Sequence, residues 1–178
     1  MSRLVIVLGG ARSGKSAYAL RLAETESAPG KTFIATCPVL DDEMRVRVER
    51  HRAERAGRGW CTLEEEVDLA GAIRSTPDGD VVLVDCLTLW INNIMYRAGA
   101  GDLPDERDVS GLAASVVDAA RGRRGLVVMV ASEVGLGIVP GSPLSRHFRD
   151  LAGRVNQFVA KAADEAVFMA AGLPLRLK

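Results

Sequence analysis

The sequence has no excess of charge of either sign. Its 178 residues include 23 Lys and Arg and 23 Asp and Glu, so the formal net charge is zero. Binding of nucleic acid depends on clustered positive charge. A chain with this balance is therefore not expected to have a nucleic-acid partner.

Cysteine is scarce, and long apolar runs are missing. The chain has an odd number of cysteines, Cys37, Cys61 and Cys86, and no CxxC spacing occurs. This argues against a disulfide framework and a zinc site, and is typical of a reducing cytoplasm. No apolar run approaches the roughly 18 residues of a membrane-spanning helix, and the run at 4–8 is too short for a signal peptide. We therefore predict a cytoplasmic protein without a transmembrane segment.

Short apolar runs alternate with segments of helical pattern along the chain. The runs are continuous, as expected for parallel strands that are buried on both faces, and lie at 4–8, 32–35, 81–84, 126–130 and 166–170. Helices are expected near 14–26, 41–56, 66–75, 87–98, 109–121 and 143–165, and a loop at 99–108. Pro174 is tolerated only at an edge or a strand start, so the chain is expected to end in an antiparallel edge strand. The pattern predicts an α/β fold with a mostly parallel sheet, in one domain over 1–178.

The segment 9–16 reads GGARSGKS and lies between the first expected strand and the first expected helix. This is the GxxxxGK[ST] pattern of a P-loop in its proper context. Glycines allow backbone N–H groups to surround phosphate oxygens, and the helix N-terminus favours the negative charge. In such a loop Lys15 contacts the β- and γ-phosphates and Ser16 binds Mg²⁺. The phosphate-binding residues that this predicts are Gly9, Gly10, Ala11, Arg12, Ser13, Gly14, Lys15 and Ser16.

Asp85 ends the apolar run VVLVD. In P-loop proteins an acidic residue at the tip of a neighbouring strand holds Mg²⁺ directly or through water. Ligands of open α/β sheets bind at this edge. Ser16 and Asp85 are thus the predicted metal ligands, the alternative being that Asp85 only caps the next helix.

The expected helix at 41–56 belongs to a strongly basic segment. Residues 45–58 contain six Arg and two Glu, a net charge of +4 in a chain of net charge zero. Arg47, His51 and Arg55 are spaced to share one helical face. Nearby cations disfavour protonation of a histidine, and a neutral imidazole can attack phosphorus. The alternative is a solvated helix face on which His51 has no chemical role.

Together these motifs resemble the bifunctional adenosylcobinamide kinase/adenosylcobinamide-phosphate guanylyltransferase family of cobalamin biosynthesis. The resemblance covers essentially the whole chain, and its most specific parts are DDEMRVRVERHRAER at 41–55 and EVGLGIVP at 133–140. It implies a RecA-like P-loop fold and a homotrimer. It also implies two reactions. The first phosphorylates adenosylcobinamide with ATP or GTP. The second transfers GMP from GTP to that phosphate through a GMP-histidine intermediate, giving adenosylcobinamide-GDP and pyrophosphate.

The resemblance also implies the residues of the site. His51 is the position of the guanylylated histidine, and Lys15 is the P-loop lysine. Further nucleotide-contacting positions that the resemblance implies are Ala35, Thr36, Cys37, Arg52, Ala53, Glu54, Arg55, Glu64 and Asp85. The implied cofactor is Mg²⁺, with GTP and ATP as co-substrates and a corrinoid, adenosylcobinamide, as the partner small molecule.

Two other functions fit parts of the pattern. The first is a P-loop kinase of another small hydroxylated substrate, in which His51 is a surface residue; labelling of a histidine by the α-phosphate of GTP would separate it. The second is a RecA-like nucleotide-dependent binding or motor protein, which the neutral charge disfavours. The stretch at 133–140 follows an expected strand and so borders the nucleotide site, where Gly135 and Gly137 permit either a mobile lid or an ordinary turn.

Overall fold

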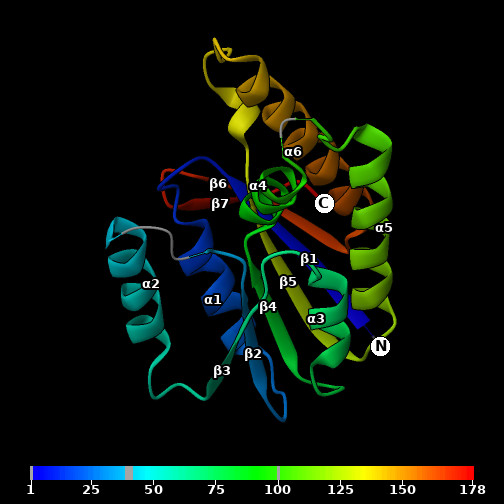
Figure 1. Cartoon of the computed structure of the whole chain (residues 1–178). Helices are drawn as coiled ribbons and strands as arrows, with labels where there is room; N and C mark the ends of the chain where they lie inside the picture. The colour runs from blue at the N-terminus through cyan, green and yellow to red at the C-terminus, as the bar shows by residue number, and fades with distance from the viewer. Residues whose placement is uncertain (1, 39–41, 100) are drawn as a thin grey trace.

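The computed structural model describes residues 2–38, 42–99 and 101–178 and is built on a seven-stranded sheet (Figure 1). The strand order is β3-β2-β4-β5-β1-β6-β7, and all neighbouring pairs are parallel except β6 with β7, which are antiparallel. The strands are β1 (Ser2–Gly9), β2 (Lys31–Ala35), β3 (Trp60–Glu64), β4 (Val81–Asp85), β5 (Gly125–Ser132), β6 (Glu165–Ala170) and β7 (Leu173–Arg176). The predicted α/β fold with an antiparallel C-terminal edge strand is confirmed.

Helices cover both faces of the sheet. They are α1 (Lys15–Thr25), α2 (Asp42–Arg55), α3 (Leu69–Ser75), α4 (Leu87–Ala98), α5 (Glu106–Arg121) and α6 (Pro143–Ala162), with a 3₁₀ turn η1 (Val134–Leu136). In Figure 1, α1 and α2 lie to one side of the sheet and α3, α5 and α6 to the other. None of the helices in the described parts of the chain is long and apolar enough to cross a membrane.

The central strands β1, β4 and β5 are apolar on both faces because each face packs on helices. Along β1, Leu4 and Ile6 pack with residues of α3, α5 and α6, whereas Val5 and Val7 pack with α1. All four side chains are fully buried. Successive side chains of a strand point to opposite faces, so a strand between two helix layers has no polar position. This explains why the apolar runs are continuous.

The structure differs from the expected elements in several places, one of which is α3, which begins at Leu69 rather than at residue 66. Strand β3 was not predicted, because it is an edge strand whose side chains are mostly exposed and carry no continuous apolar run. Helix α5 begins at Glu106 rather than 109, since Asp105 and Asp108 form a capping box, and the expected loop at 99–108 ends correspondingly early. Helix α6 ends at Ala162, three residues before the expected end, because Ala163 is extended. Residues 41 and 100, which belong to the expected helix and loop, lie outside the described residues.

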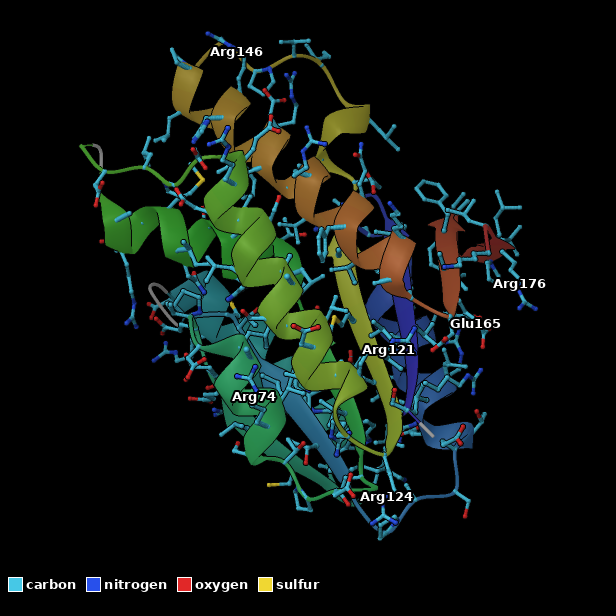
Figure 2. The ribbon with its side chains drawn as sticks, turned by 90° about the vertical axis from the view of Figure 1, so that its right-hand side faces the viewer. Arg74, Arg121, Arg124, Arg146, Glu165 and Arg176 are labelled. Carbon is cyan, nitrogen blue, oxygen red and sulfur yellow. The ribbon has the colours of Figure 1, made fainter. Side chains whose placement is uncertain are left out.

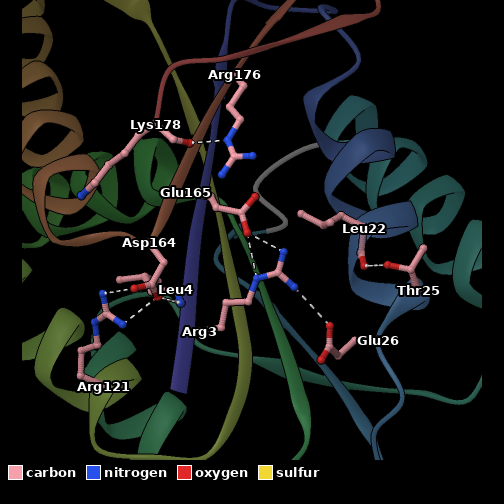
Figure 3. A network of polar contacts seen from close by, with 10 residues as sticks. All are labelled: Arg3, Leu4, Leu22, Thr25, Glu26, Arg121, Asp164, Glu165, Arg176 and Lys178. Atoms are coloured by element: carbon pink, nitrogen blue, oxygen red, sulfur yellow. Dashed lines mark hydrogen bonds and ion pairs between the residues drawn. The ribbon is translucent and has the colours of Figure 1, made fainter. Parts of the chain in front are cut away.

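Asp164 lies between α6 and β6 and connects this turn to β1 and to α5 (Figure 3). Its Oδ2 accepts hydrogen bonds from the backbone N–H of Leu4 and from Nη1 of Arg121, both at 2.7 Å, and its Oδ1 accepts one from Nη2 of Arg121 at 3.0 Å. The hydrogen bonds from Arg121, followed by the one from Leu4, hold the pKa of the Asp164 carboxyl below its ordinary value. Ionised Asp164 thus links β1 to the end of α5.

The Asp164→Asn variant is expected to unfold more easily at neutral pH, by about 1 kcal/mol, because it keeps an acceptor for Leu4 but loses the charge that pairs with Arg121. A carboxyl whose pKa is lowered in the folded state stabilises the fold above its unfolded pKa and loses this effect as the pH falls through the folded pKa. The difference between wild type and variant, measured by urea unfolding, should therefore close in acid. Asp150→Asn, which removes a pair only with the adjacent Arg149, is the control. A difference that stays constant as the pH falls through the acid range would contradict this account.

Candidate functional site

The turn between β1 and α1 is shaped for a phosphate group. Gly9 has φ +154° and Gly14 has φ +91°, and a Cβ on Gly9 would come within 2.6 Å of the Ser13 Oγ and 2.7 Å of the Met169 carbonyl oxygen. Gly14 stands at the N-cap of α1, and no side chain caps the first N–H groups of this helix. Uncapped N–H groups at a helix N-terminus attract anions. The geometry therefore fits the predicted phosphate cradle.

The side chains of this loop are placed in different ways. Lys15 donates from Nζ to the Gly10 carbonyl at 3.0 Å, so its ammonium group lies over the loop. Ser13 is buried, and its Oγ has no hydrogen-bond partner among the described residues. Ala11 and Arg12 are exposed. Ser16, one residue beyond Lys15, faces a pocket.

That pocket opens between α2 and the carboxyl ends of β2, β3 and β4. It is lined by Ser16, Phe33, Ala35, Cys37, Val48, His51, Arg52, Arg55, Thr62, Glu64, Asp85, Cys86 and Leu89. Eight of these are predicted site residues: Ser16, Ala35, Cys37, His51, Arg52, Arg55, Glu64 and Asp85. The tertiary structure thus brings the P-loop serine and the basic helix to one cavity.

Asp85 ends β4 at the carboxyl edge of the sheet. Strand β5 lies between β4 and the P-loop strand β1, so Asp85 is one strand further away than the expected neighbouring position. It nevertheless lines the same pocket as Ser16. In the described parts of the chain no three His, Cys, Asp or Glu side chains gather as a metal site. A metal ion here would be held by the Ser16 hydroxyl and the Asp85 carboxylate, and otherwise by oxygens of a bound anion.

His51 lies on α2 with its side chain 27% exposed. Its Nδ1 is 3.5 Å from Oε2 of Glu54, one helical turn further along. A carboxylate beside one ring nitrogen favours the tautomer that carries the proton there and leaves the other nitrogen, Nε2, with its lone pair. This tautomer is the one in which Nε2 can act as a nucleophile.

Arg55 forms a cationic wall of the pocket. It is only 5% exposed, its Nη1 donates to the His51 carbonyl at 2.7 Å, and its guanidinium carbon lies 3.5 Å from the centre of the Phe33 ring. Burial lowers the pKa of Arg55, yet a guanidinium remains charged at neutral pH. Its buried Nε has no partner in the described part of the chain. This fixed charge faces the space where an anionic ligand would lie.

Comparison with known proteins places these features in a family. The model for "cobinamide kinase / cobinamide phosphate guanyltransferase" matches residues 5–177. The chain belongs to this cobinamide kinase/guanyltransferase family. The family that the sequence resembles is thereby confirmed.

Curated relatives match over almost the whole chain. The bifunctional adenosylcobalamin biosynthesis protein CobU of Salmonella typhimurium is 38% identical, covering 98% of this chain and 99% of its own length. The protein of the same name in Escherichia coli is 39% identical with the same coverage, and CobP of Pseudomonas aeruginosa is 41% identical over 97% of this chain and 96% of its own length.

Solved structures support the RecA-like fold. The flagellar accessory protein FlaH of Methanocaldococcus jannaschii aligns with a TM-score of 0.54 at 15% identity, over 99% of this chain and 78% of its own. A solved ATPase domain of another protein aligns with a TM-score of 0.53 at 15% identity, over 94% of this chain and 69% of its own. At this identity the likeness concerns the fold alone.

Within this cobinamide kinase/guanyltransferase fold, some predicted positions lie outside the pocket wall. Ala53 and Glu54 are exposed on α2, where Glu54 contacts His51. By contrast, Arg52 and Glu64, which both line the pocket, form an ion pair between α2 and β3. The side chain of Arg47, which was expected to share a face with His51, lies outside the described residues.

Several pocket residues were not predicted. They are Phe33, Val48, Thr62, Cys86 and Leu89. Val48 precedes His51 by three residues, and this spacing signals a shared helix face. Phe33 belongs to an apolar strand run, which indicates only core. Burial raises the pKa of the Cys86 thiol to about 11, so this thiol stays protonated at neutral pH.

Thr36 does not line the pocket but contacts the backbone of Cys86, which does. It is fully buried, its Oγ1 donates to the Cys86 carbonyl, and the Cys86 N–H donates to the same oxygen, each at 2.8 Å. One hydroxyl thus contacts both backbone groups of the residue after Asp85, whose carbonyl also accepts the Trp90 N–H at 3.1 Å. Thr36 is therefore a positioning residue in this structure.

The Thr36→Val variant keeps the side-chain shape but leaves the Cys86 N–H and C=O without this partner. We expect a loss of about 1–3 kcal/mol in the free energy of unfolding, because the buried Cys86 N–H loses its acceptor, whereas the Cys86 carbonyl still accepts the Trp90 N–H at 3.1 Å. Thr36→Ser keeps the hydroxyl and should lose less than half as much. Both are measured by urea denaturation, and a loss in Thr36→Ser as large as that in Thr36→Val would contradict a dominant role of the hydroxyl.

Proposed function

We propose that this protein phosphorylates adenosylcobinamide with ATP or GTP and then transfers GMP from GTP to the adenosylcobinamide phosphate. The products of the second step are adenosylcobinamide-GDP and pyrophosphate. One observation carries this proposal: a single pocket is lined by Ser16 of the P-loop and by His51 of the basic helix. A simple P-loop kinase has no use for a histidine at that place.

In the first reaction the P-loop binds the phosphates of the nucleotide. The N–H groups at the start of α1 and the Lys15 ammonium balance the charge on the β- and γ-phosphates. Phosphoryl transfer needs positioning and charge stabilisation more than covalent help. The uncapped N-terminus of α1 and the position of Lys15 over the loop support this role for the predicted cradle, Gly9 to Ser16.

In the second reaction His51 is the proposed nucleophile. Its Nε2 attacks the α-phosphorus of GTP, a P–N bond forms, and the bond to the bridging oxygen breaks to release pyrophosphate. An oxygen of the corrinoid phosphate then attacks the same phosphorus and breaks the P–N bond. Glu54 supports the reactive tautomer of His51, and Arg52 and Arg55 stabilise charge on the phosphates.

The donor set suits Mg²⁺. This ion is usually held by one or two carboxylates together with substrate phosphates, and Ser16 and Asp85 offer one hydroxyl and one carboxylate to one pocket. Bound there, Mg²⁺ would neutralise phosphate charge. Thr36 holds the backbone that follows Asp85 and so keeps this carboxylate at the pocket.

Assembly and location are also part of the proposal. We propose a homotrimer, as the family resemblance implies. Exposed apolar side chains, among them Leu173 at 71% and Leu175 at 58% on β7, support a further contact surface. A cytoplasmic location is supported by the free thiols of Cys37, Cys61 and Cys86.

The nucleophile is tested by incubating the protein with α-labelled GTP and counting label after denaturation. Wild type should retain an acid-labile label, because a phosphoramidate hydrolyses in acid, and His51→Asn should retain none. γ-Labelled GTP should leave no label, since that phosphate departs in pyrophosphate.

The chain offers a matched control, because its one other histidine is His147, whose Nε2 lies 2.8 Å from the Pro104 carbonyl oxygen. His147→Asn should label like wild type. Persistent α-label in His51→Asn would exclude His51 as the nucleophile.

The metal site is tested with Ser16→Ala and Asp85→Asn. Each should raise the Mg²⁺ concentration for half-maximal phosphoryl transfer by roughly tenfold or more, because a ligand or its outer partner is lost. Asp78→Asn is the control, since Asp78 lies before the other end of β4 and pairs with Arg124. An unchanged Mg²⁺ requirement in Asp85→Asn would exclude this carboxylate as a ligand.

A further inference from the structure

Glu133 stands at the start of the P-loop. It directly follows β5, the strand between the P-loop strand β1 and the Asp85 strand β4. Its backbone N–H donates to the Gly9 carbonyl at 3.1 Å. The carboxyl edge of three adjacent strands therefore presents, in order, Asp85, Glu133 and the phosphate cradle.

The carboxylate of Glu133 is held by a buried amide. Asn156 on α6 is only 5% exposed, and its Nδ2 donates both to Oε1 of Glu133 at 3.0 Å and to the Ser132 carbonyl at 3.1 Å. On the other side, the Ser132 N–H donates to Oγ1 of Thr88 on α4 at 2.7 Å. Two helices thus fix the tip of β5. In the part of the chain that the structure describes, Oε2 of Glu133 has no hydrogen-bond partner.

Helix α6 also holds the far end of the segment that begins at Glu133. Arg146, labelled at the top of Figure 2, donates from Nη1 to the carbonyls of Pro140 at 2.9 Å and Gly141 at 2.7 Å. Between these anchors, Leu136 and Ile138 are 73% and 97% exposed. Glu133 is therefore a fixed group at the root of an otherwise outward-facing loop.

Other carboxylates at this edge are already engaged. Asp85 is the proposed metal ligand, Glu64 pairs with Arg52, and Oε1 of Glu65 accepts the N–H groups of Val67 and Asp68. Glu133 does not line the pocket of His51. It is thus a carboxylate beside the phosphate cradle that the guanylyl transfer does not use.

The phosphoryl transfer needs such a group. An alcohol is a weak nucleophile at neutral pH, and a positioned carboxylate that removes its proton accelerates transfer by about 10²–10⁴-fold. Resting on the proposed function, we propose that Glu133 is the general base of the kinase reaction. Its carboxylate accepts the proton of the corrinoid hydroxyl as that oxygen forms a bond to the γ-phosphorus. The bond between this phosphorus and the β–γ bridging oxygen breaks, the nucleoside diphosphate leaves with the electron pair, and Glu133 later returns the proton to water.

Two half-reactions measured on the same preparations test this assignment. Transfer of label from γ-labelled ATP to adenosylcobinamide reports the kinase, and α-label on His51 reports the guanylylation, which needs no acceptor. Glu133→Gln keeps an acceptor for Asn156, so it should fold normally. We expect its kinase kcat to fall by about 100-fold or more, with KM for both substrates within about threefold and α-labelling within about twofold of wild type.

Glu133→Asp retains a carboxylate and should have a kcat between those of Glu133→Gln and wild type. Glu106→Gln is the matched control, because it too removes the charge of a glutamate that contacts α6, through Arg154, and both half-reactions should be unchanged. A wild-type kcat in Glu133→Gln overturns the assignment. A parallel loss of both half-reactions also overturns it, since Glu133 would then only support the P-loop. If wild type takes α-label but phosphorylates no adenosylcobinamide, the proposed function itself fails, and the base with it.

Discussion

Burial of β1, β4 and β5 on both faces of the sheet is the constraint on which the site depends. Parallel strands that are packed between helices end at one common edge, and their polar ends can only meet there. Gly9, Asp85 and Ser132 are the last residues of these strands. The apolar core therefore decides where the phosphate cradle, the proposed metal ligand and Glu133 lie, although none of these residues is part of it.

Buried polar side chains fix the backbone at this carboxyl edge of the sheet. Thr36 satisfies the backbone of Cys86, and Asn156 satisfies the tip of β5. Both side chains are buried. A buried hydrogen bond has few alternatives to its one geometry, because breaking it leaves an unsatisfied group in a medium of low polarity. These buried hydrogen bonds therefore fix the positions of the site residues at the end of the sheet.

The two proposed reactions use opposite sides of the same nucleotide-binding edge. His51, Arg52 and Arg55 come from α2, whereas Glu133 is held by α6 on the other side of the sheet. This arrangement would let the P-loop serve both transfers while each has its own proton-handling or nucleophilic group. Arg55 belongs to the first side, where stacking on Phe33 and the contact with the His51 carbonyl hold its charge inside the fold.

Local pattern was sufficient for the α/β class, the P-loop and most strands, because continuous apolar runs and the GxxxxGKS spacing report on burial and backbone shape directly. It also marked Asp85 and His51 by residue type and neighbours. It did not reveal β3, which is exposed, nor that the predicted strand β5 lies between β4 and β1, since strand order depends on long-range pairing. Pocket residues such as Phe33 and Leu89 look like ordinary core in the sequence. That His51 shares a pocket with Ser16, and that Asn156 holds Glu133, are matters of tertiary packing. They join residues 35 and 23 positions apart, respectively, and no local periodicity records such contacts.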